Sequence, residues 1–294
     1  NKEMKLSKSF IGLVTVSTIF MLYASGLYKN LQSDSALEIV DFSIAKPASE
    51  KNIPSNPDRV PLYGDLHVHT KYSFDAYIFG VTATPYDAYK YAIGEAIKHP
   101  LGFDMKLKEP LDFYAVTDHG FYMGMIENYA DTSSEMSKNE WTKPMHNLNR
   151  PENVTVESLG ARANLFSSVL TQAIIKPYPY WHPKVWKAWL TNNIQVALQS
   201  FDYDVHKSAW ADVANAAEEF NDPGKFTTFI GYEFTTSTDV EGGNLHRNVI
   251  FNSSDAPIRP WTRIDSINPE DLWTWMDGLR DQGLDSLAMP HNSN

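Results

Sequence analysis

The sequence of 294 residues contains no cysteine, so it can form no disulfide bond and offers no thiolate to a metal ion. Any metal site must therefore be built from His, Asp and Glu side chains. Basic residues are also scarce, with 25 Lys and Arg against 36 Asp and Glu and a formal net charge of −11. A surface that follows nucleic-acid phosphates needs a basic patch, so the composition argues against nucleic acid as the main partner.

Glycine-rich phosphate loops, internal repeats and low-complexity tracts are also absent from the sequence. Apolar residues make up 43% of the chain and aromatic residues 13%, which is enough for a hydrophobic core and excludes a wholly disordered protein. The length suits one large domain or two small ones.

The N-terminus has the pattern of an export signal. Three lysines precede an apolar run from Phe10 to Tyr23, and small residues follow at 24–26. We expect residues 1–26 to be a cleaved signal peptide or an uncleaved membrane anchor, and only in the uncleaved form would residues 10–28 contact lipid. A buried helix is the third alternative. The protein would then be exported to the periplasm or the extracellular space, with or without an anchor. Residues 27–57 are polar and contain three prolines, which is typical of a linker.

From residue 58 onward, segments of strand type alternate with segments of helix type. Strands are expected at 64–69, 111–117, 226–234, 245–251 and 286–289, and helices at 84–98, 155–170, 186–199, 209–220 and 269–281. Such alternation predicts an α/β fold with a mostly parallel sheet or barrel covered by helices. Residues 121–225 differ in pattern and are expected to form a helical insertion, whose aromatic residues pack on the domain or line a substrate pocket.

The segment Gly64-Asp65-Leu66-His67-Val68-His69-Thr70 places two histidines one residue apart on an expected strand. Alternate side chains of a strand share a face, so His67 and His69 should project together, with Asp75 shortly behind them. Neutral imidazole is a good ligand for zinc, iron and manganese, so this pair is half of a metal site. A strand end with two solvated histidines is the alternative for an isolated pair.

Further potential ligands lie at or near the ends of the later strands. They are Asp118, His119, Glu233, His246 and His291. Taken singly, each has a simpler explanation, such as a helix cap, a solvated strand end or a core histidine. The strand ends of a barrel converge on one mouth, however, where so many such side chains would require cations. With His67 and His69 included, five of the nine histidines belong to this pattern, which favours one shared metal centre.

The order and wording of these motifs resemble the polymerase-and-histidinol-phosphatase (PHP) superfamily. Gly-Asp-Leu-His-Val-His-Thr, Thr-Asp-His-Gly, Gly-Tyr-Glu-Phe-Thr and Pro-His-Asn are similar to the motifs of DUF3604, an exported PHP-like family, over about residues 59–294. The resemblance implies a distorted (β/α)7 barrel and a cleft with two or three divalent ions of zinc, manganese or iron. It implies a first metal held by His67, His69 and Glu233, a second by Glu233, His246 and His291, and a third by Asp75 and His119.

The resemblance also implies a metal-dependent hydrolase with a small anionic ester as its substrate. The leading hypothesis is a phosphoesterase that uses a metal-activated water, with Glu233, Asp118 and Arg247 as catalytic candidates. Asp118 is expected mainly to orient its neighbours. Arg247 would neutralise charge on the phosphate, although its place beside His246 on a strand turns it to the opposite face and favours a structural ion pair.

Several alternatives stay open on the sequence alone. The same site could hydrolyse a sulfate ester or another anionic ester, because fold and metals do not set the leaving group. The chain could also be a non-catalytic binding protein or a metal-buffering protein. The superfamily closes its site with a late Asp-x-His, which does not occur after His291. We therefore expect an incomplete, C-terminally truncated barrel with poor activity as it stands.

Overall fold

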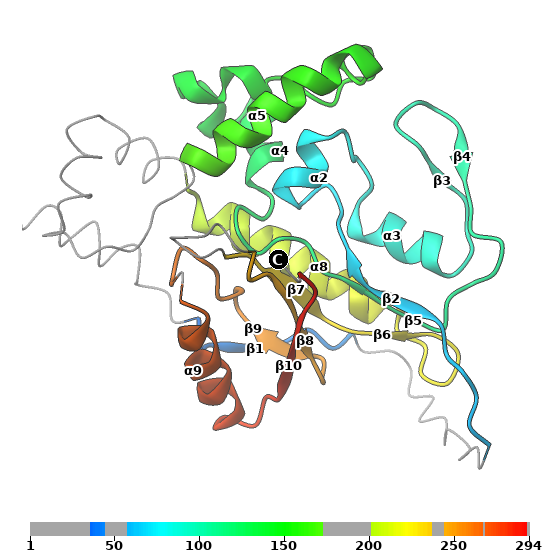
Figure 1. Cartoon of the computed structure of the whole chain (residues 1–294). Coiled ribbons are helices and arrows are strands. Elements are labelled where there is room, and N and C mark those ends of the chain that lie inside the picture. The colour runs from blue at the N-terminus through cyan, green and yellow to red at the C-terminus, as the bar shows by residue number, and fades with distance from the viewer. Residues whose placement is uncertain (1–35, 45–57, 173–200, 237–243, 267, 293–294) are drawn as a thin grey trace, which may run out of the picture.

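A computed structural model describes residues 36–44, 58–172, 201–236, 244–266 and 268–292 (Figure 1). The expected signal segment 1–26 and the expected helix 186–199 with its aromatic neighbours lie outside these residues. Among the helices that are described, none combines the length and the apolar character needed to cross a membrane.

Short strands make up the centre of the molecule. They are β1 (Ile39–Asp41), β2 (Gly64–Val68), β3 (Ile97–Lys98), β4 (Asp104–Met105), β5 (Phe113–Val116), β6 (Thr227–Thr228), β7 (Gly231–Phe234), β8 (Arg247–Phe251), β9 (Asp255–Pro257) and β10 (Ser286–Pro290). β2, β5 and β6 form a parallel sheet in the order β2-β5-β6, whereas β7, β8 and β10 form an antiparallel sheet in the order β10-β8-β7. β1 pairs with β9 and β3 pairs with β4, both antiparallel.

The expectation of a mostly parallel sheet is therefore wrong for the described strands, since it holds only for β2, β5 and β6. Antiparallel neighbours need no helical crossover between them, so β7 and β8 can pair directly along the chain. Within the ranges that the structure describes, the sheets do not close into a barrel. The (β/α)7 barrel stays a prediction.

One backbone contact joins the two central sheets just beyond β5. His119 and Glu233 form an isolated parallel bridge, in which Glu233 N donates to Asp118 O (2.9 Å) and Gly120 N donates to Glu233 O (2.9 Å). The segment after β5 thus runs alongside β7. This contact places the carboxyl end of one sheet directly beside a strand of the other.

Helices surround the strands. They are α2 (Phe74–Ile78), α3 (Pro85–Ala92), α4 (Met125–Ala130), α5 (Leu159–Gln172), α8 (Tyr203–Phe220) and α9 (Pro269–Arg280), with short 3-10 helices η1 (Met136–Lys138), η2 (Glu140–Met145), η3 (Pro151–Asn153) and η4 (Val156–Ser158). Within the expected insertion 121–225, α4 and α5 lie on one side of the molecule, whereas α8 passes close to the strands (Figure 1). α8 begins six residues before the expected start at 209, where Asp202 caps its first turn.

The start of α3 is confirmed and its expected end is wrong. Thr84 and Asp87 form a reciprocal capping box, and Pro85 occupies the first helical position. The helix was expected to continue to 98 but ends at Ala92. Gly94 adopts φ +83°, a left-handed conformation that breaks the helix, and 97–98 then enter the β3–β4 hairpin.

The expected strand 226–234 is two strands in two sheets. β6 pairs with β5, whereas β7 pairs with β8. The change of sheet comes just before Gly231, where a Cβ atom would stand 2.7 Å from Ile250 Cδ1 and 2.9 Å from Val249 O. Only glycine permits this close approach of β7 to β8.

Part of the expected linker 27–57 is packed on the domain. β1 pairs with β9, Ala36 is buried, and Trp275 Nε1 donates to Ala36 O (2.8 Å). Residues 36–44 thus differ from the expectation, because Ile39 and Val40 suit a strand and find a partner far along the chain.

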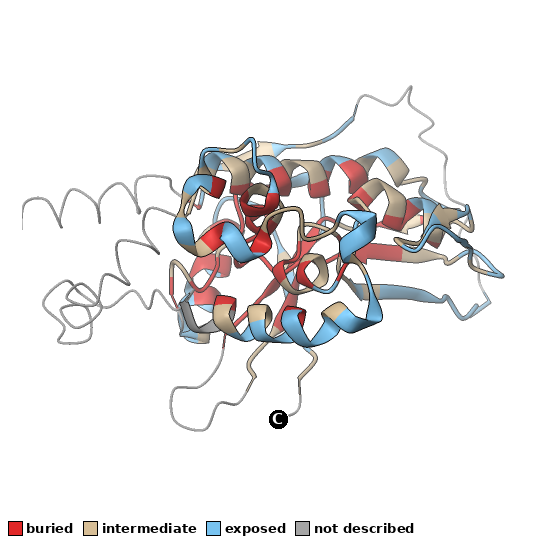
Figure 2. Cartoon of the chain, turned by 90° about the horizontal axis from the view of Figure 1, so that it is seen from above, coloured by how far each residue is buried: buried red, intermediate tan, exposed pale blue. Residues whose placement is uncertain are grey.

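Two hydrophobic clusters hold the elements together, and buried residues gather in the strands and on the inner helix faces (Figure 2). The larger cluster joins α3, α8 and α9 to β5, β7 and β8. The smaller cluster joins α2, α4, η2 and α5. Phe74 of the smaller cluster lies 4.8 Å from the His119 ring, which follows β5. The boundary between the two clusters is therefore where the polar side chains of the predicted site meet.

Candidate metal centre

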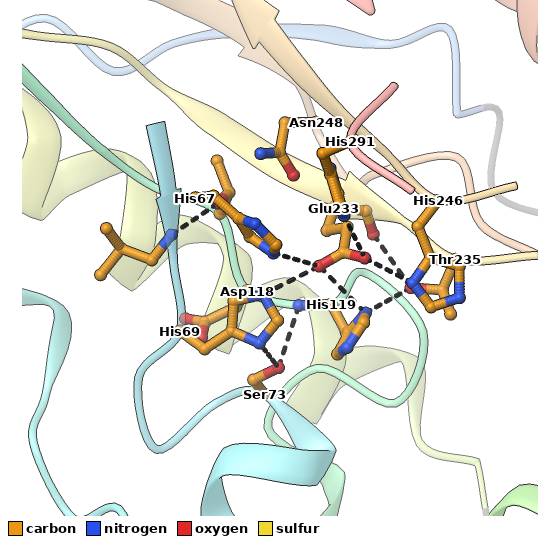
Figure 3. A network of polar contacts seen from close by, with 12 residues as sticks. His67, His69, Ser73, Asp118, His119, Glu233, Thr235, His246, Asn248 and His291 are labelled. Carbon is orange, nitrogen blue, oxygen red and sulfur yellow. Dashed lines mark hydrogen bonds and ion pairs between the residues drawn. The ribbon is translucent and has the colours of Figure 1, made fainter. Parts of the chain in front are cut away.

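Glu233 lies at the centre of a cluster of five imidazoles (Figure 3). Its Oε1 is 2.7 Å from His246 Nδ1 and 3.2 Å from His291 Nε2. Its Oε2 is 2.8 Å from His69 Nε2, 3.4 Å from His67 Nε2 and 3.4 Å from His119 Nδ1. The carboxylate is 1% exposed, so water contributes little to its solvation.

The five histidines come from four separate segments of the chain. His67 lies in β2 and His69 just beyond it, and both reach Glu233 Oε2, which confirms that they project to the same side. His119 follows β5, His246 precedes β8, and His291 follows β10. Figure 1 shows β10 ending near the centre of the molecule, where His291 joins the other ligands. The residues expected at strand ends thus meet in one place, although His246 comes from the start of β8 and the described strands form no closed barrel.

Asp75 extends the cluster on the α2 side. Its Oδ1 is 3.3 Å from His69 Nδ1 and its Oδ2 is 3.4 Å from His119 Nε2. Asp75 lies in the first turn of α2, where Ala76 N donates to it, and the helix N-terminus favours the negative charge. Seven predicted ligands therefore meet in one place: His67, His69, Asp75, His119, Glu233, His246 and His291.

The side chains form three overlapping groups that could each hold a metal ion. The groups are His67 with Glu233 and His291, His69 with Asp75 and His119, and His119 with Glu233 and His246. This grouping differs from the one that the resemblance implied, which placed His67 with His69. The His67 ring is 4.0 Å from the His291 ring and 5.1 Å from the His69 ring. His69 turns instead toward α2, because Asp75 and Ser73 engage its Nδ1.

Thr235 affects which ring nitrogen of His119 is available to a metal ion. His119 Nδ1 is 2.5 Å from Thr235 Oγ1, a buried hydroxyl, while His119 Nε2 faces Asp75. A neutral imidazole gives a metal ion one lone pair, and the partner of its other nitrogen decides which one. The contact with Thr235 therefore favours His119 acting together with His69 and Asp75.

Several buried polar atoms of the cluster lack a hydrogen-bond partner. They are His69 Nε2, Glu233 Oε2, His291 Nδ1 and Asn248 Oδ1. His69 Nε2 and Glu233 Oε2 are only 2.8 Å apart, yet they are not aligned for a hydrogen bond. Buried polar atoms normally have partners, and unpaired ones are costly. The nitrogen and oxygen donors thus fit a metal ion, since a cation shared between them would satisfy both.

The charges of the cluster agree with this fit. Burial alone would raise the pKa of Glu233, but contacts with His246 and His69 bring that pKa below its ordinary value. Burial would lower the pKa of His69, but the Asp75 and Glu233 carboxylates raise it to about 10. Burial would raise the pKa of Asp75, but His119 and His69 hold it well below its usual range. The carboxylates and His69 therefore all favour positive charge at this point.

Asp118 lies behind the ligands and not among them. Thr70 N donates to its Oδ1 (2.5 Å) and Thr70 Oγ1 donates to its Oδ2 (2.6 Å). Burial raises the pKa of Asp118 to about 6, although both Thr70 bonds oppose this shift. Since Thr70 follows His69 and Asp118 precedes His119, the pair holds the two ligand-bearing loops together.

Arg247 does not join the cluster. On β8 it pairs with Phe234, one residue past the Glu233 and Asn248 pair, so its side chain leaves from the opposite face. Its guanidinium lies over the Trp273 ring at 4.7 Å, and its Nε donates to Leu245 O (3.0 Å). The expected opposite face is thus confirmed, and within the described ranges Arg247 contacts an aromatic ring and not the expected ion-pair partner.

Sequence analysis missed Asn248, Ser73 and Thr235. Asn248 stands opposite Glu233 on the neighbouring strand and is 3% exposed. Its Nδ2 donates to Leu66 O (2.7 Å) on β2, so its Oδ1 is turned toward the cluster (Figure 3). The spacing from His246 was a usable signal, because residues two apart on a strand share a face.

The remaining described histidines have other surroundings. His99 stacks on Phe103, His146 Nε2 contacts Ser137 O (2.9 Å), and His206 is buried in α8. A cavity of about 820 Å³ lies beyond Lys71, between α4 and α8, and none of the seven candidate ligands lines it.

Comparison with known proteins gives a family and no further relative. Residues 56–294 match the family model described as "Protein of unknown function (DUF3604)". No curated protein and no solved structure was found to match the chain. The matched range includes every residue of the cluster around Glu233, and the chain belongs to the DUF3604 family.

Proposed function

We propose that the chain is an exported metal-dependent hydrolase that cleaves phosphate esters. The observation that carries the proposal is the buried Glu233 carboxylate among five imidazoles, with Asp75 beside them. A donor set made only of imidazole nitrogens and carboxylate oxygens suits zinc, manganese or iron. The resemblance of the motifs to the PHP superfamily supports the same reaction class, and export rests on the N-terminal pattern alone.

Two or three divalent ions would be held by the groups around Glu233, and when bound they supply an activated water and charge neutralisation for attack on phosphorus. Glu233 offers one oxygen to the His246 and His291 side and the other to the His67, His69 and His119 side. It is therefore the residue best placed to connect neighbouring groups. Asp118 keeps the His69 and His119 loops in register through Thr70.

His67 marks the open side of the centre. Its side chain is 46% exposed, whereas those of His69, His246 and His291 are about one-fifth exposed or less, at 17%, 20% and 19%. A substrate approaching from solvent would therefore meet the His67 and His291 group first. An anionic ester suits this approach, because metal ions would give the mouth of the site a local positive charge in spite of the acidic protein.

The test combines elemental analysis with a panel of chromogenic phosphate mono-, di- and sulfate esters. The wild-type chain should bind two or three ions, and metal content should fall in His67→Ala and Glu233→Gln. Any turnover by the wild-type chain, even if slow, should be fastest on a phosphate ester. His99→Ala and Glu218→Gln are matched controls, because both residues lie away from the cluster. His99 is in the β3–β4 hairpin, and Glu218, on α8, accepts a hydrogen bond from Ser254. Hydrolysis of sulfate esters alone would show that the substrate is a sulfate ester and not a phosphate ester.

A chain that binds no metal and turns over no ester would overturn the proposal. His67→Ala is informative because its exposed ring can be removed without opening a cavity in the core.

A further inference from the structure

Ser73 occupies the N-cap position of α2, yet its hydroxyl does not cap the helix. Its backbone is extended (φ −75°, ψ 130°), as an N-cap requires, but its side chain accepts no hydrogen bond from a backbone N–H of the first turn. Serine at this position normally accepts a bond from a backbone N–H of that turn. The hydroxyl, which is fully buried, has therefore been diverted from a common helix-stabilising role.

The hydroxyl contacts all three members of one ligand group. Figure 3 shows its contacts with His69 and with the His119 backbone. Ser73 Oγ donates to Asp75 Oδ1 (2.7 Å), accepts from the backbone N of His119 (3.2 Å), and is 3.1 Å from His69 Nδ1.

Proton counting assigns the direction of the contact with His69. A serine hydroxyl has one proton, and it goes to the Asp75 carboxylate, which can only accept. The backbone N–H of His119 can only donate to Ser73 Oγ. The remaining lone pair of Oγ must therefore accept from His69 Nδ1–H, and Asp75 Oδ1 at 3.3 Å receives the same proton more weakly.

We propose that Ser73 is a positioning residue of the candidate metal centre, where it keeps the proton of His69 on Nδ1 and presents Nε2 as the metal-binding nitrogen. Nε2 is the atom that lies 2.8 Å from Glu233 Oε2 without hydrogen-bond geometry. The same hydroxyl ties Asp75 and the His119 main chain to His69, so the geometry of the whole group depends on it. This inference rests on the metal centre of the proposed function.

Metal binding in Ser73→Ala tests the inference. Partners that orient ligating histidines change metal affinity by about 10–100-fold, so zinc affinity, measured by competition with a chelator, should fall by at least about tenfold. Ser73→Thr keeps the hydroxyl and should recover most of that loss. Ser137→Ala is the control, because Ser137 is also buried and bonds a backbone carbonyl (Ser134 O, 2.8 Å) away from the cluster. It should bind zinc as the wild type does.

A second readout is independent of turnover and of the stability of the variants. Long-range ¹H–¹⁵N spectra of the zinc-loaded wild-type chain should show His69 protonated at Nδ1. A His69 protonated at Nε2 would overturn the inference even if Ser73→Ala failed to fold.

Failures of the two proposals can be told apart. A wild-type chain that binds zinc while Ser73→Ala binds it equally well would overturn this inference alone. A wild-type chain that takes up no metal would overturn the proposed function and this inference with it. A merely structural Ser73 would lower the melting temperature of Ser73→Ala and leave zinc affinity unchanged, which counts against the inference.

Discussion

His119 and Glu233 are joined twice, once by their backbones and once by their side chains. They form a parallel bridge between the two central sheets, and His119 Nδ1 lies 3.4 Å from Glu233 Oε2. The contact that unites the sheets is thus also a contact inside the candidate metal centre. The position of these ligands therefore depends on sheet packing as well as on side-chain rotamers.

Gly120 makes this bridge possible, and Gly120→Ala should disturb it. A Cβ at this position would stand 2.8 Å from Cδ2 of the buried Tyr232 ring and 3.2 Å from Thr262 Cγ2. Overpacking of this kind costs about 1–3 kcal/mol, and the shift should also reduce metal content. Urea unfolding measures the loss. In Gly160→Ala, where nothing lies within 4 Å of the new Cβ in α5, stability should be unchanged or slightly higher. Equal effects of the two substitutions would contradict the packing argument.

Metal removal should lower the stability of the native protein. A ligand that binds only the folded state stabilises it by about 2.7 kcal/mol at a concentration of 100 times its Kd. An excess of chelator should therefore lower the melting temperature, and added zinc or manganese should restore it. The measurement is a thermal scan with and without chelator. An unchanged melting temperature in a chain shown to contain metal would mean that the ions lie outside the folded cluster.

Asn248→Ala should destabilise the junction of the sheets. Its Nδ2 donates to Leu66 O on β2, although Leu66 O also accepts from Thr117 Oγ1 (3.2 Å). Loss of a buried hydrogen bond costs about 1 kcal/mol, and more where a partner is left unpaired. Asn153→Ala removes a similar bond to Asn147 O at an exposed site and should cost less than about 0.5 kcal/mol. Equal losses in denaturant unfolding would argue against a role for Asn248 in joining β8 to β2.

Arg247 should contribute to stability and not to metal binding. Its guanidinium lies over Trp273 on the face of β8 away from Glu233. A double-mutant cycle with Arg247→Met and Trp273→Ala should give a coupling of about 0.5–1 kcal/mol. Metal content should stay at the wild-type value in Arg247→Met. A loss of bound metal in that variant would return Arg247 to the candidate site.

His206 should make the protein sensitive to acid. Burial, together with the positive charge of Arg259, lowers the pKa of His206 from its ordinary value of 6.5 to about 3. The folded state therefore resists a proton that the unfolded state accepts. Above pH 6.5, His206 causes no loss of stability. As pH falls from 6.5 toward 3, its resistance to protonation lowers the free energy of unfolding by about 1.4 kcal/mol per pH unit.

The acid sensitivity is measured by denaturant unfolding at pH 7 and pH 5. His206→Gln should lose less stability than the wild type between these values, whatever its stability at pH 7. His99→Gln, at the β3–β4 hairpin, should retain the wild-type difference. A wild-type difference in His206→Gln would show that another group carries the acid response.

Local rules within the sequence identified most of the ligands and some of the elements. The one-residue spacing of His67 and His69 placed them on one face, because side chains of a strand alternate. Thr84, Pro85 and Asp87 marked the start of α3, because a capping box is completed within one turn. The absence of cysteine restricted the metal donors to His, Asp and Glu. These inferences needed no knowledge of distant contacts.

Tertiary structure alone decided which candidate ligands lie together. His291 reaches Glu233 because β10 pairs with β8 and β8 with β7, and strand register is a long-range property. His67 lies in the other central sheet and meets His291 because the His119–Glu233 bridge joins the two sheets. The same register placed Asn248 beside Glu233 and Arg247 on the far face. Ser73 occupies the N-cap position of α2, where a serine usually caps the helix. Only its tertiary surroundings divert the hydroxyl to His69, Asp75 and His119. A side chain's type follows from the sequence, but its partner depends on which buried polar groups the fold brings within hydrogen-bond reach.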